Sequence, residues 1–460
     1  MTDRYPRETR WELGQDADNR IIGSLDRTLA IGTSYRWNMC LDPNTCYTFI
    51  ITDSYGDGVC CGYGTGEYTL YYDDELIHSG GEFRREEVTH FGSTTCASAH
   101  PTATPHPSAS TEPTRPWMQV GDDIHGEALG DQSGRSVALS SDGQVVAVGA
   151  RYNDGGGEDS GQVRVYANTK GAWQQIGNDL DGAAGNQLGW SVSLSSDGSV
   201  LAVNSGRYPY HVNVFRWDGR SWQDLGPGIY GVPFALSDDG RVLALRGGYP
   251  GYDVKVFVLS GTDWIQRGGI LSGLSEDDNF GFSIALSADG SIVACTGNPP
   301  AGSGNPTYVR LSRWNGATWL SHGATLFGAS GPVSLSGDGR ILTTRVDNDV
   351  AVYQYGGHGW ARIGQTIESW LCGYPAVLSL DGNTIVCRDY IGGSIYVAVY
   401  RLSPNRDQWL RVGQGILAAN GNDFSSLSVS GDGSRIAVGE AAGDANGIDS
   451  GTVRVFDPII

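Results

Sequence analysis

The chain has 460 residues, enough for two or three domains of average size. It carries 31 Lys and Arg against 51 Asp and Glu, a formal net charge of −20, without a run of basic residues. Nucleic acids and anionic membrane surfaces require clustered basic residues, so the sequence argues against both as partners. Abundant glycine (68 residues) together with 13 tryptophans predicts an all-β protein of short strands and tight turns.

Cysteine usage indicates an oxidising compartment. No stretch approaches the ~18 consecutive apolar residues of a membrane helix, so we expect no membrane insertion, and residues 1–14 lack the apolar core of a signal peptide. Five of the eight cysteines nevertheless crowd the first hundred residues. Dense cysteine beside a Pro/Thr-rich segment is typical of secreted proteins. We therefore expect an extracellular or cell-surface protein that begins after its leader, the alternative being a cytosolic protein with reduced thiols.

Residues 1–96 form the first predicted domain. The stretch from Cys46 to Phe83 reads CYTFIITDSYGDGVCCGYGTGEYTLYYDDELIHSGGEF, and the preceding WELGQDADNRIIGS would supply opening strands. This pattern resembles a small cysteine-containing β-sandwich module built around Asp-Ser-Tyr-Gly-Asp-Gly, which occurs in secreted and surface proteins. The resemblance implies an accessory or adhesion role and no particular reaction.

Two carboxylates of this first domain, Asp53 and Asp57, lie four residues apart in a glycine-bent loop. Calcium favours such oxygen-rich turns, since backbone carbonyls can complete its shell. Asp and Gly are equally ordinary turn residues, so a calcium site here and a plain turn remain alternatives.

The five cysteines of this domain cannot all pair with one another. Cys40 with Cys46 is one possible disulfide, but the connectivity cannot be deduced from spacing. At least one thiol is left over, for pairing with another domain or another chain. The set comprises Cys40, Cys46, Cys60, Cys61 and Cys96.

Residues 97–116 form a linker. The segment ASAHPTATPHPSASTEPTRP contains five Pro and seven Ser or Thr in twenty positions, so it cannot pack a core and favours an extended polyproline conformation. Such compositions are often O-glycosylated stalks, although a bare spacer is the alternative. The candidate acceptors are Thr102, Thr104, Ser108, Ser110, Thr111 and Thr114.

Residues 117–460 repeat. The pattern Leu-Ser-x-Asp-Gly, or a close variant, precedes an apolar run seven times, with a mean spacing of about 48 residues, which is in the range of propeller blades. Asp-Gly suits a two-residue hairpin turn, so each copy predicts two antiparallel strands, and a third alternating strand follows each pair. The seven pairs begin at Asp142, Asp197, Asp239, Asp289, Asp338, Asp381 and Asp432.

A fourth strand carries the pattern Trp, three residues, Gly, also seven times but shifted by one strand. The tryptophans are Trp117, Trp173, Trp222, Trp264, Trp319, Trp360 and Trp409. We therefore expect a closed seven-bladed β-propeller in which the Trp117 strand becomes the outer strand of the last blade, formed by residues 425–456. The tryptophans are expected to pack between blades, with ligand stacking as the alternative.

The phasing also predicts two faces. The Asp-Gly turns lie on one face, and the longer loops, where binding is expected, lie on the other. The repeat resembles the FG-GAP repeats of integrin-α-type propellers over the whole of 117–460, most clearly at Leu188–Val203 and Phe280–Cys295. It departs from them because the Gly-Ala-Pro element survives only as Gly149-Ala150-Arg151, and because the inner hairpins lack the Asp-rich calcium loop.

Two equivalent loops of the first and last blades predict an acidic seam. Asp154 matches Asp444, and Asp159 matches Asp449, in blades that become neighbours when the ring closes. The segment between them adds further carboxylates. Such a seam would take cations, calcium among them, or a basic partner; solvated loops with Asx turns are the favoured alternative. The additional acids are Asp122, Asp123, Glu127 and Asp131.

The remaining thiols are predicted to be structural. Cys372 and Cys387 lie at the paired ends of the hairpin of the sixth blade, so a cross-strand disulfide is plausible, and Cys295 is expected to be a buried apolar residue. Catalytic signatures are missing. The leading function is non-enzymatic: a cell-surface, matrix or appendage component that contacts other extracellular proteins, copies of itself or glycans. The rival is a carbohydrate-active enzyme with carboxylates on the loop face.

Overall fold

The computed structural model places two compact units, Met1–Ser108 and Ala109–Ile460. Up to residue 116 it describes six strands only. Beyond that point it describes residues 117–247, 252–300, 303–347, 349–367, 376–391, 394–418 and 424–458. Within these residues every regular element is a β-strand. None of the described segments is a helix long and apolar enough to cross a membrane.

The first unit contains a four-stranded antiparallel sheet in the order β2-β1-β3-β6 and a separate hairpin of β4 and β5. The predicted opening strands correspond to β1 and β2. Their bounds are β1 (Thr9–Gln15), β2 (Arg20–Ser24), β3 (Cys46–Asp53), β4 (Tyr68–Tyr72), β5 (Glu75–Gly80) and β6 (Glu86–Gly92).

Several predictions for this unit and its linker fall outside the described residues. Asp53 is the last residue of β3 and Cys46 its first, but no side chain of the unit is described. The calcium, disulfide and glycosylation predictions therefore stay predictions. The residues concerned that lie outside the described strands are Asp57, Cys40, Cys60, Cys61, Cys96, Thr102, Thr104, Ser108, Ser110, Thr111 and Thr114.

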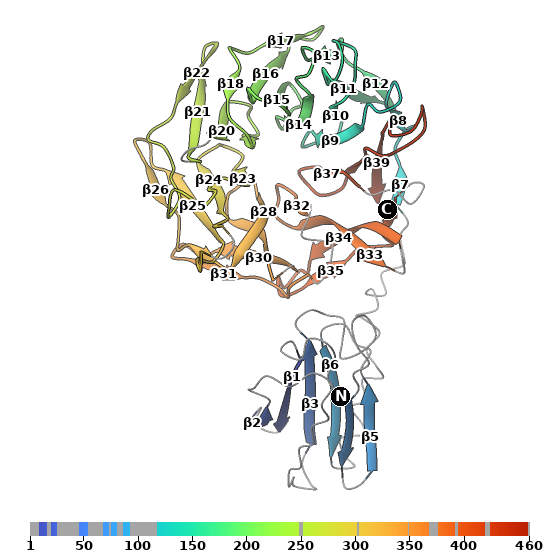
Figure 1. The fold of residues 1–460 in the computed structure, drawn as a ribbon, viewed down its shortest axis with the longest axis vertical. Coiled ribbons are helices and arrows are strands. Elements are labelled where there is room, and N and C mark those ends of the chain that lie inside the picture. The colour runs from blue at the N-terminus through green and yellow to red at the C-terminus, as the bar shows by residue number, and fades with distance from the viewer. Residues whose placement is uncertain are drawn as a thin grey trace. The chain divides into compact units, whose positions relative to one another are not determined.

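The second unit is a ring of seven sheets (Figure 1). In each blade the Asp-Gly hairpin supplies the two inner strands and the tryptophan strand forms the rim, as predicted. From the centre outwards, the first three blades are β9 (Ser133–Leu139), β10 (Val145–Ala150), β11 (Gln162–Thr169), β12 (Ala172–Gln175); β14 (Leu188–Leu194), β15 (Val200–Ser205), β16 (His211–Trp217), β17 (Trp222–Asp224); and β19 (Phe234–Leu236), β20 (Val242–Arg246), β21 (Val254–Ser260), β22 (Asp263–Gln266).

Blades 4 to 7 follow the same order. They are β23 (Ile284–Leu286), β24 (Ile292–Gly297), β25 (Tyr308–Trp314), β26 (Trp319–Ser321); β28 (Ala329–Leu335), β29 (Ile341–Val346), β30 (Asp349–Tyr355), β31 (Trp360–Arg362); β32 (Ala376–Leu378), β33 (Thr384–Ile391), β34 (Ser394–Leu402), β35 (Trp409–Arg411); and β37 (Ser426–Val429), β38 (Ile436–Glu440), β39 (Thr452–Pro458), β7 (Trp117–Gln119). Five two-residue strands pair with third strands: β8 (Ile124–His125), β13 (Leu180–Asp181), β18 (Ile229–Tyr230), β27 (Leu326–Phe327) and β36 (Ile416–Leu417).

The ring closes as the sequence predicts. β7 pairs antiparallel with β39, so that Gln119 faces Phe456 and Trp117 faces Pro458. The first strand of the propeller thus completes the sheet begun by its last residues. The all-β, seven-bladed fold with an N-terminal outer strand is confirmed. Its core lies between blades: one cluster joins Ala147 and Val163 of blade 1 to buried residues of blade 2.

The Asp-Gly turns have a different geometry from the two-residue turn expected. In blade 1, Ser140 Oγ donates to Asp142 Oδ1 at 2.6 Å and accepts from the Val145 amide at 2.9 Å, and the Ser140 amide donates to the Val145 carbonyl. Four residues therefore form the loop, and only Gly143 has a positive φ, 66°. The same serine–aspartate contact recurs in all seven blades, so these aspartates are structural.

A ring of backbone hydrogen bonds links the seven turns around the axis. The amide of the residue after each serine donates to the carbonyl of the equivalent residue in the next blade, at 2.7–3.0 Å, and Gly431 closes the circle onto Ser141. Blade 6 varies slightly, because Asp381 donates where Leu380 accepts. Among the residues that directly follow the serines, Asp238 alone is charged; the others are Ser141, Ser196, Ala288, Gly337, Leu380 and Gly431.

Replacing Asp238 by serine, the residue that blades 1 and 2 carry there, is expected to stabilise the protein at pH 7. Burial, with a smaller contribution from Asp239, raises the pKa of Asp238 to about 6. A raised carboxyl pKa means that the folded state prefers the protonated form, so the wild type loses stability as pH rises from about 4 through 6. We expect a gain of about 1–2 kcal/mol at pH 7, allowing for solvent screening.

Urea denaturation of Asp238→Ser and wild type between pH 4 and 8 checks this expectation. The difference between the two proteins in free energy of unfolding should shrink as the pH falls towards 4. A difference that is constant over this range, or that grows in acid, would contradict it.

The tryptophans lie between blades, as predicted. The glycine of six Trp-x-x-x-Gly patterns provides room for the tryptophan of the following blade: a Cβ on Gly121 would lie 3.0 Å from Trp173 Cδ1, and one on Gly364 2.7 Å from Trp409 Cδ1. Six indole N–H groups donate to the carbonyl that precedes this glycine, at 2.8–3.3 Å. They belong to Trp173, Trp222, Trp264, Trp319, Trp360 and Trp409.

Trp117, at the seam between blades 6 and 7, is the exception. Its indole nitrogen is buried and has no hydrogen-bond partner within the described residues. We therefore expect Trp264→Phe, which breaks a 2.8 Å bond to the Leu225 carbonyl, to cost about 1 kcal/mol more stability than Trp117→Phe. Chemical denaturation of the two variants measures the difference; equal losses would mean that the hydrogen bond contributes nothing.

Candidate functional site on the loop face

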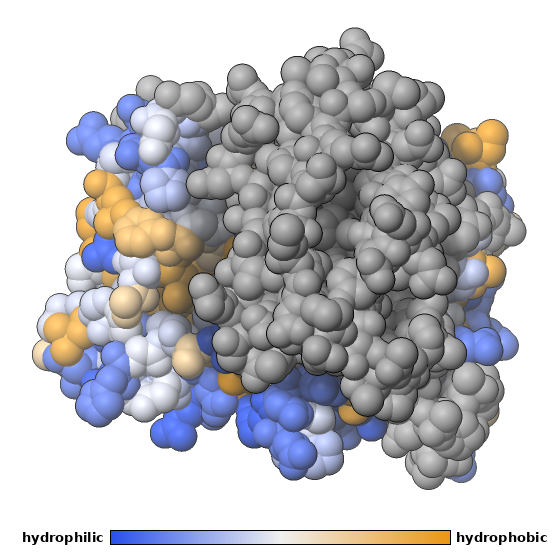
Figure 2. All heavy atoms as spheres, turned by 90° about the horizontal axis from the view of Figure 1, so that it is seen from below, coloured by the Kyte–Doolittle hydropathy of each residue, from blue (hydrophilic) through white to orange (hydrophobic). Residues whose placement is uncertain are grey.

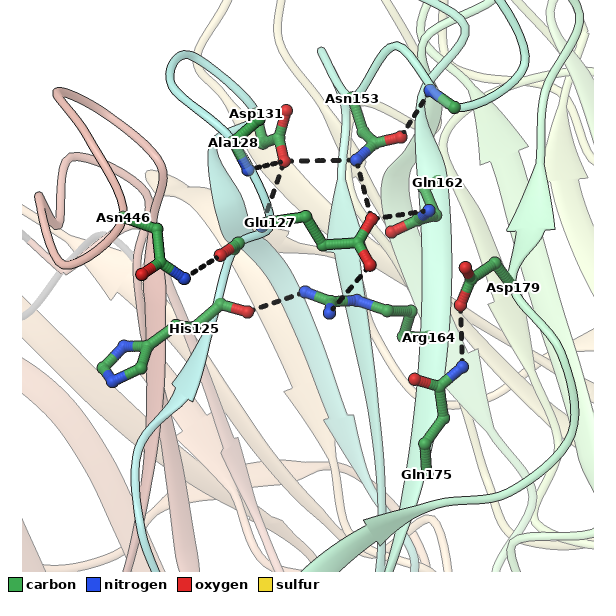
Figure 3. A network of polar contacts seen from close by, with 12 residues as sticks. His125, Glu127, Ala128, Asp131, Asn153, Gln162, Arg164, Gln175, Asp179 and Asn446 are labelled. Carbon is green, nitrogen blue, oxygen red and sulfur yellow. Dashed lines mark hydrogen bonds and ion pairs between the residues drawn. The ribbon is translucent and has the colours of Figure 1, made fainter.

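The loop face carries the loops between second and third strands and between blades. At the seam between blades 7 and 1 it holds Glu127 and Asp131, two of the acids singled out in the sequence, and Figure 3 shows both in a polar network. Asp131 is buried: its Oδ2 accepts from the amides of Glu127 at 3.1 Å and Ala128 at 2.8 Å, and from Asn153 Nδ2 at 3.1 Å. This carboxylate therefore fastens the loop that contains it.

Glu127 lies at the centre of the same network. Its carboxylate is 3.6 Å from Arg164 and accepts from the side-chain amides of Asn153 at 3.3 Å and Gln162 at 3.2 Å (Figure 3). Arg164 in turn donates to the His125 carbonyl at 2.8 Å. Both acids are thus engaged with groups of this chain.

The four matched acids form equivalent turns. Asp154 Oδ1 accepts from the Asp159 amide at 2.8 Å, and Asp444 Oδ1 accepts from the Asp449 amide at 2.9 Å. Asp159 and Asp449 both have positive φ, 51° and 57°. The structure thus brings the two loops to equivalent places at neighbouring seams and gives each the local hydrogen bonds of a turn.

The other two acids of the predicted seam lie near the rim. Asp123 accepts from Gln119 Nε2 at 2.6 Å, which repeats the contact between Gln175 and Asp179 in the next blade. Asp122 lines a polar recess of about 340 Å³ together with His125. Among the described residues, no three side chains of His, Cys, Asp or Glu gather as ligands of a metal ion. A cation at the seam stays a prediction, and the hydrogen bonds here are those of turns.

A basic and aromatic cluster lies on the same face between blades 1 and 2. Arg135 projects from β9, Arg151 follows β10, and Trp190 lies on β14. The two guanidinium carbons are 4.9 and 4.7 Å from the centre of the Trp190 ring, and Arg151 is also 4.4 Å from the Tyr152 ring. Ser136 joins the two inner strands, because its hydroxyl donates to the Gly189 carbonyl at 2.9 Å. Adjacent blades thus place two cations on one indole.

Neutral side-chain amides orient Arg151 and a nearby third arginine, Arg207. Arg151 Nε donates to Gln132 Oε1 at 2.8 Å, and the amide of Gln187, turned with its oxygen towards Arg207, accepts from that guanidinium at 3.1 and 3.3 Å. Gln132 and Gln187 occupy the same place in their blades and share a positive φ of 54–55°. An amide oxygen orients a guanidinium without cancelling its charge.

The charge of this cluster is uncompensated. None of the ion pairs found among the described residues includes Arg135 or Arg151. Burial, and next the nearby Arg151, lower the pKa of Arg135. Arg207 is 3.9 Å from Asp159, but both side chains are largely exposed, so this pair contributes little. An anion bound between Arg135 and Arg151 would relieve their mutual repulsion.

Sequence reasoning missed this cluster. Arg135, Arg151 and Trp190 are separated by up to 55 residues and meet only because their blades are neighbours. One signal was present: Arg151 stands where the FG-GAP pattern has proline, so the departure from the motif coincides with the site. The expectation that the chain lacks clustered basic residues holds along the sequence but not in space.

The prediction for Cys295 is confirmed, whereas the predicted disulfide between Cys372 and Cys387 is only half described. Cys295 is free and fully buried, as expected, and burial raises its pKa. Cys387 is disulfide-bonded, and it faces Ala376 in the ladder between β32 and β33. Cys372 lies outside the described residues, so its pairing with Cys387 stays a prediction; intact mass with and without reductant would test it.

One comparison with known proteins bears on the repeats of the propeller. Residues 126–166 match the FG-GAP repeat family, which together with the seven blades confirms the FG-GAP resemblance. A search of curated proteins found no match. Among solved structures, the chain is similar to a "putative 6-phosphogluconolactonase" from Bacteroides uniformis ATCC 8492, with 14% identity, a TM-score of 0.47, and coverage of 62% of this chain and 85% of that one. A likeness at this level carries no information on function.

Proposed function

We propose that this chain is a non-enzymatic extracellular binding protein whose propeller takes an anionic ligand on the loop face, at Arg135, Arg151 and Trp190. One observation carries this function: two guanidinium groups without a carboxylate partner lie against a half-exposed indole in a chain of net charge −20. Two like charges held close together repel each other, and a bound anion would offset this unfavourable free energy. Guanidinium groups bind carboxylates, sulfates and phosphates through two parallel hydrogen bonds.

Other features support binding over catalysis. Glu127 and Asp131, which a glycosidase would need as free carboxylates, are engaged with Arg164 and with backbone amides. Trp190 is 37% exposed, so part of this residue is available to a ligand. A role in protein or glycan contacts at a cell surface, in a matrix or in an appendage also agrees with the FG-GAP resemblance, and a disulfide at Cys387 agrees with an oxidising compartment.

Binding of the full chain to immobilised acidic polymers tests this function. The probes are polygalacturonate, poly-L-glutamate and dextran sulfate, with neutral dextran as the blank. We expect at least one acidic polymer to bind, to weaken with added salt, and to lose about tenfold in affinity in Arg151→Gln, because one charge-assisted contact contributes about 1.5–3 kcal/mol.

Arg220→Gln is the matched control. Arg220 is exposed in the hairpin between β16 and β17, on the opposite face, so its loss changes the net charge equally without touching the cluster. If no acidic polymer binds, or if Arg220→Gln weakens binding as much as Arg151→Gln, the proposed site is wrong.

A further inference from the structure

We infer that the ligand of this site is an acidic polysaccharide, because an aromatic platform continues the cationic cluster across blade 2. This inference rests on the proposed function and adds the class of ligand to it. The platform consists of Tyr208, Tyr210 and Tyr230, whose side chains are 77%, 37% and 41% exposed. In the view from below, patches of hydrophobic residues lie among hydrophilic ones on the described surface of the propeller (Figure 2). The tyrosines are a separate feature, and soluble proteins rarely group large aromatic rings in solvent without a partner.

The rings of the platform contact one another edge to face. Tyr208 lies 6.3 Å from both Tyr210 and Tyr230, with interplanar angles of 87° and 78°. Tyr230 makes the same kind of contact with His211 at 6.3 Å and 80°. Edge-to-face packing of this kind fixes ring orientation while leaving ring faces open.

The backbone below the platform is fastened. The single proton of the buried Ser205 hydroxyl is shared between the carbonyls of Arg207 and Pro209, at 3.4 and 3.3 Å, and its oxygen accepts from the His211 amide at 3.1 Å. β18 pairs with the start of β16, so that Tyr230 faces His211 in the ladder. A platform held in this way loses little conformational entropy when a ligand binds.

The segment that carries Tyr208 also lies against the cationic cluster. Arg207 directly precedes Tyr208, and a Cβ on Gly206 would lie 2.7 Å from the Trp190 ring. The order along this part of the loop face is therefore guanidinium groups around Trp190, then Arg207, then three phenol rings. This is longer than a single small anion requires, and it combines a cationic part with an aromatic part.

This combination of guanidinium groups and aromatic rings matches the chemistry of a polyuronate. Each sugar ring has an apolar C–H face that packs on an aromatic ring, hydroxyls that hydrogen-bond to phenol groups, and a carboxylate at its edge for a guanidinium. An acidic peptide carries its carboxylates on flexible arms and offers no rigid apolar face to the tyrosines, so it would use the arginines alone.

The experiment compares polygalacturonate with poly-L-glutamate on wild type, Tyr208→Ala, Tyr208→Phe and Arg151→Gln, with calorimetric or interferometric readout on the full chain. We expect wild type to prefer polygalacturonate at least about tenfold, and Tyr208→Ala to lose about tenfold towards it. Tyr208→Phe keeps the ring and should retain most of the affinity. Tyr390→Ala, which removes a ring of 48% exposure on blade 6, is the matched control and should not change binding.

The outcomes separate the two proposals. If Arg151→Gln weakens binding but Tyr208→Ala does not, or if poly-L-glutamate binds as tightly as polygalacturonate, the anionic site stands and the polysaccharide assignment fails. If Arg151→Gln has no effect, the proposed function fails with it. Loss of binding in Tyr208→Ala and Tyr390→Ala alike would also overturn the assignment. Thermal melting of each variant confirms that it is folded.

Discussion

Gly161→Ala is expected to destabilise the propeller by about 2–5 kcal/mol. Gly161 bridges blade 1 to Leu188 of blade 2, and a Cβ there would lie 2.2 Å from both the Leu188 amide nitrogen and carbonyl oxygen. Its φ of 70° adds a left-handed conformation, which costs about 1–2 kcal/mol for alanine, and the forced separation of two backbones adds about 1–3 kcal/mol. Chemical denaturation of the full chain gives the measurement.

Gly185→Ala separates the two contributions. Gly185 has a similar φ, 78°, but a Cβ there meets nothing within 4 Å. It should therefore cost only the conformational part, about 1–2 kcal/mol. Equal losses in the two variants would show that the blades can move apart to accommodate the methyl group, against the close approach described above.

Glu440→Ala is expected to cost about 3–5 kcal/mol, because it leaves a buried cation without its partner. Glu440 is 1% exposed, and its Oε1 accepts from both Nε and a terminal nitrogen of Arg454, the former at 2.8 Å. Arg454 also donates to the Leu417 carbonyl at 2.8 Å, so it cannot turn outwards without breaking a second bond. Urea denaturation at neutral pH measures the loss.

Two comparisons sharpen this expectation. Arg207→Gln removes a solvent-exposed ion pair with Asp159 and should change stability by less than about 1 kcal/mol. The double variant Glu440→Leu/Arg454→Met replaces both charges by apolar groups and should recover most of the loss. If the double variant is as unstable as Glu440→Ala, packing around Glu440 and not the unpaired charge is the cause.

Much of the architecture could be predicted because short repeated sequence patterns specify its strands and turns. The Asp-Gly and Trp-x-x-x-Gly patterns each occur seven times with an offset of one strand, and that offset predicted that the Trp117 strand completes the last blade, where Trp117 pairs with Pro458. The length of the turns could not be predicted in this way, because it depends on the Ser140 hydroxyl bridging to Asp142 and Val145.

The sites were harder to predict for two different physical reasons. Aspartates such as Asp131 and Asp154 serve equally well as cation ligands and as acceptors for nearby backbone amides, and only the distances to those amides decide between the roles. The cationic cluster depends on contacts between blades. No local pattern places Arg135 and Arg151 on the ring of Trp190, although the arginine at position 151 marked an unusual blade.

The unpaired indole of Trp117 has a mechanical consequence. Tension carried by residues 97–116 enters the propeller at Trp117, on a strand that only three residue pairs join to β39. At the six other seams an indole hydrogen bond would resist such a load, whereas at this one the indole nitrogen is without a partner in the described chain. Under stretching, the ring should yield first where the tether meets it, and blade 7 would open while the remaining blades stay assembled.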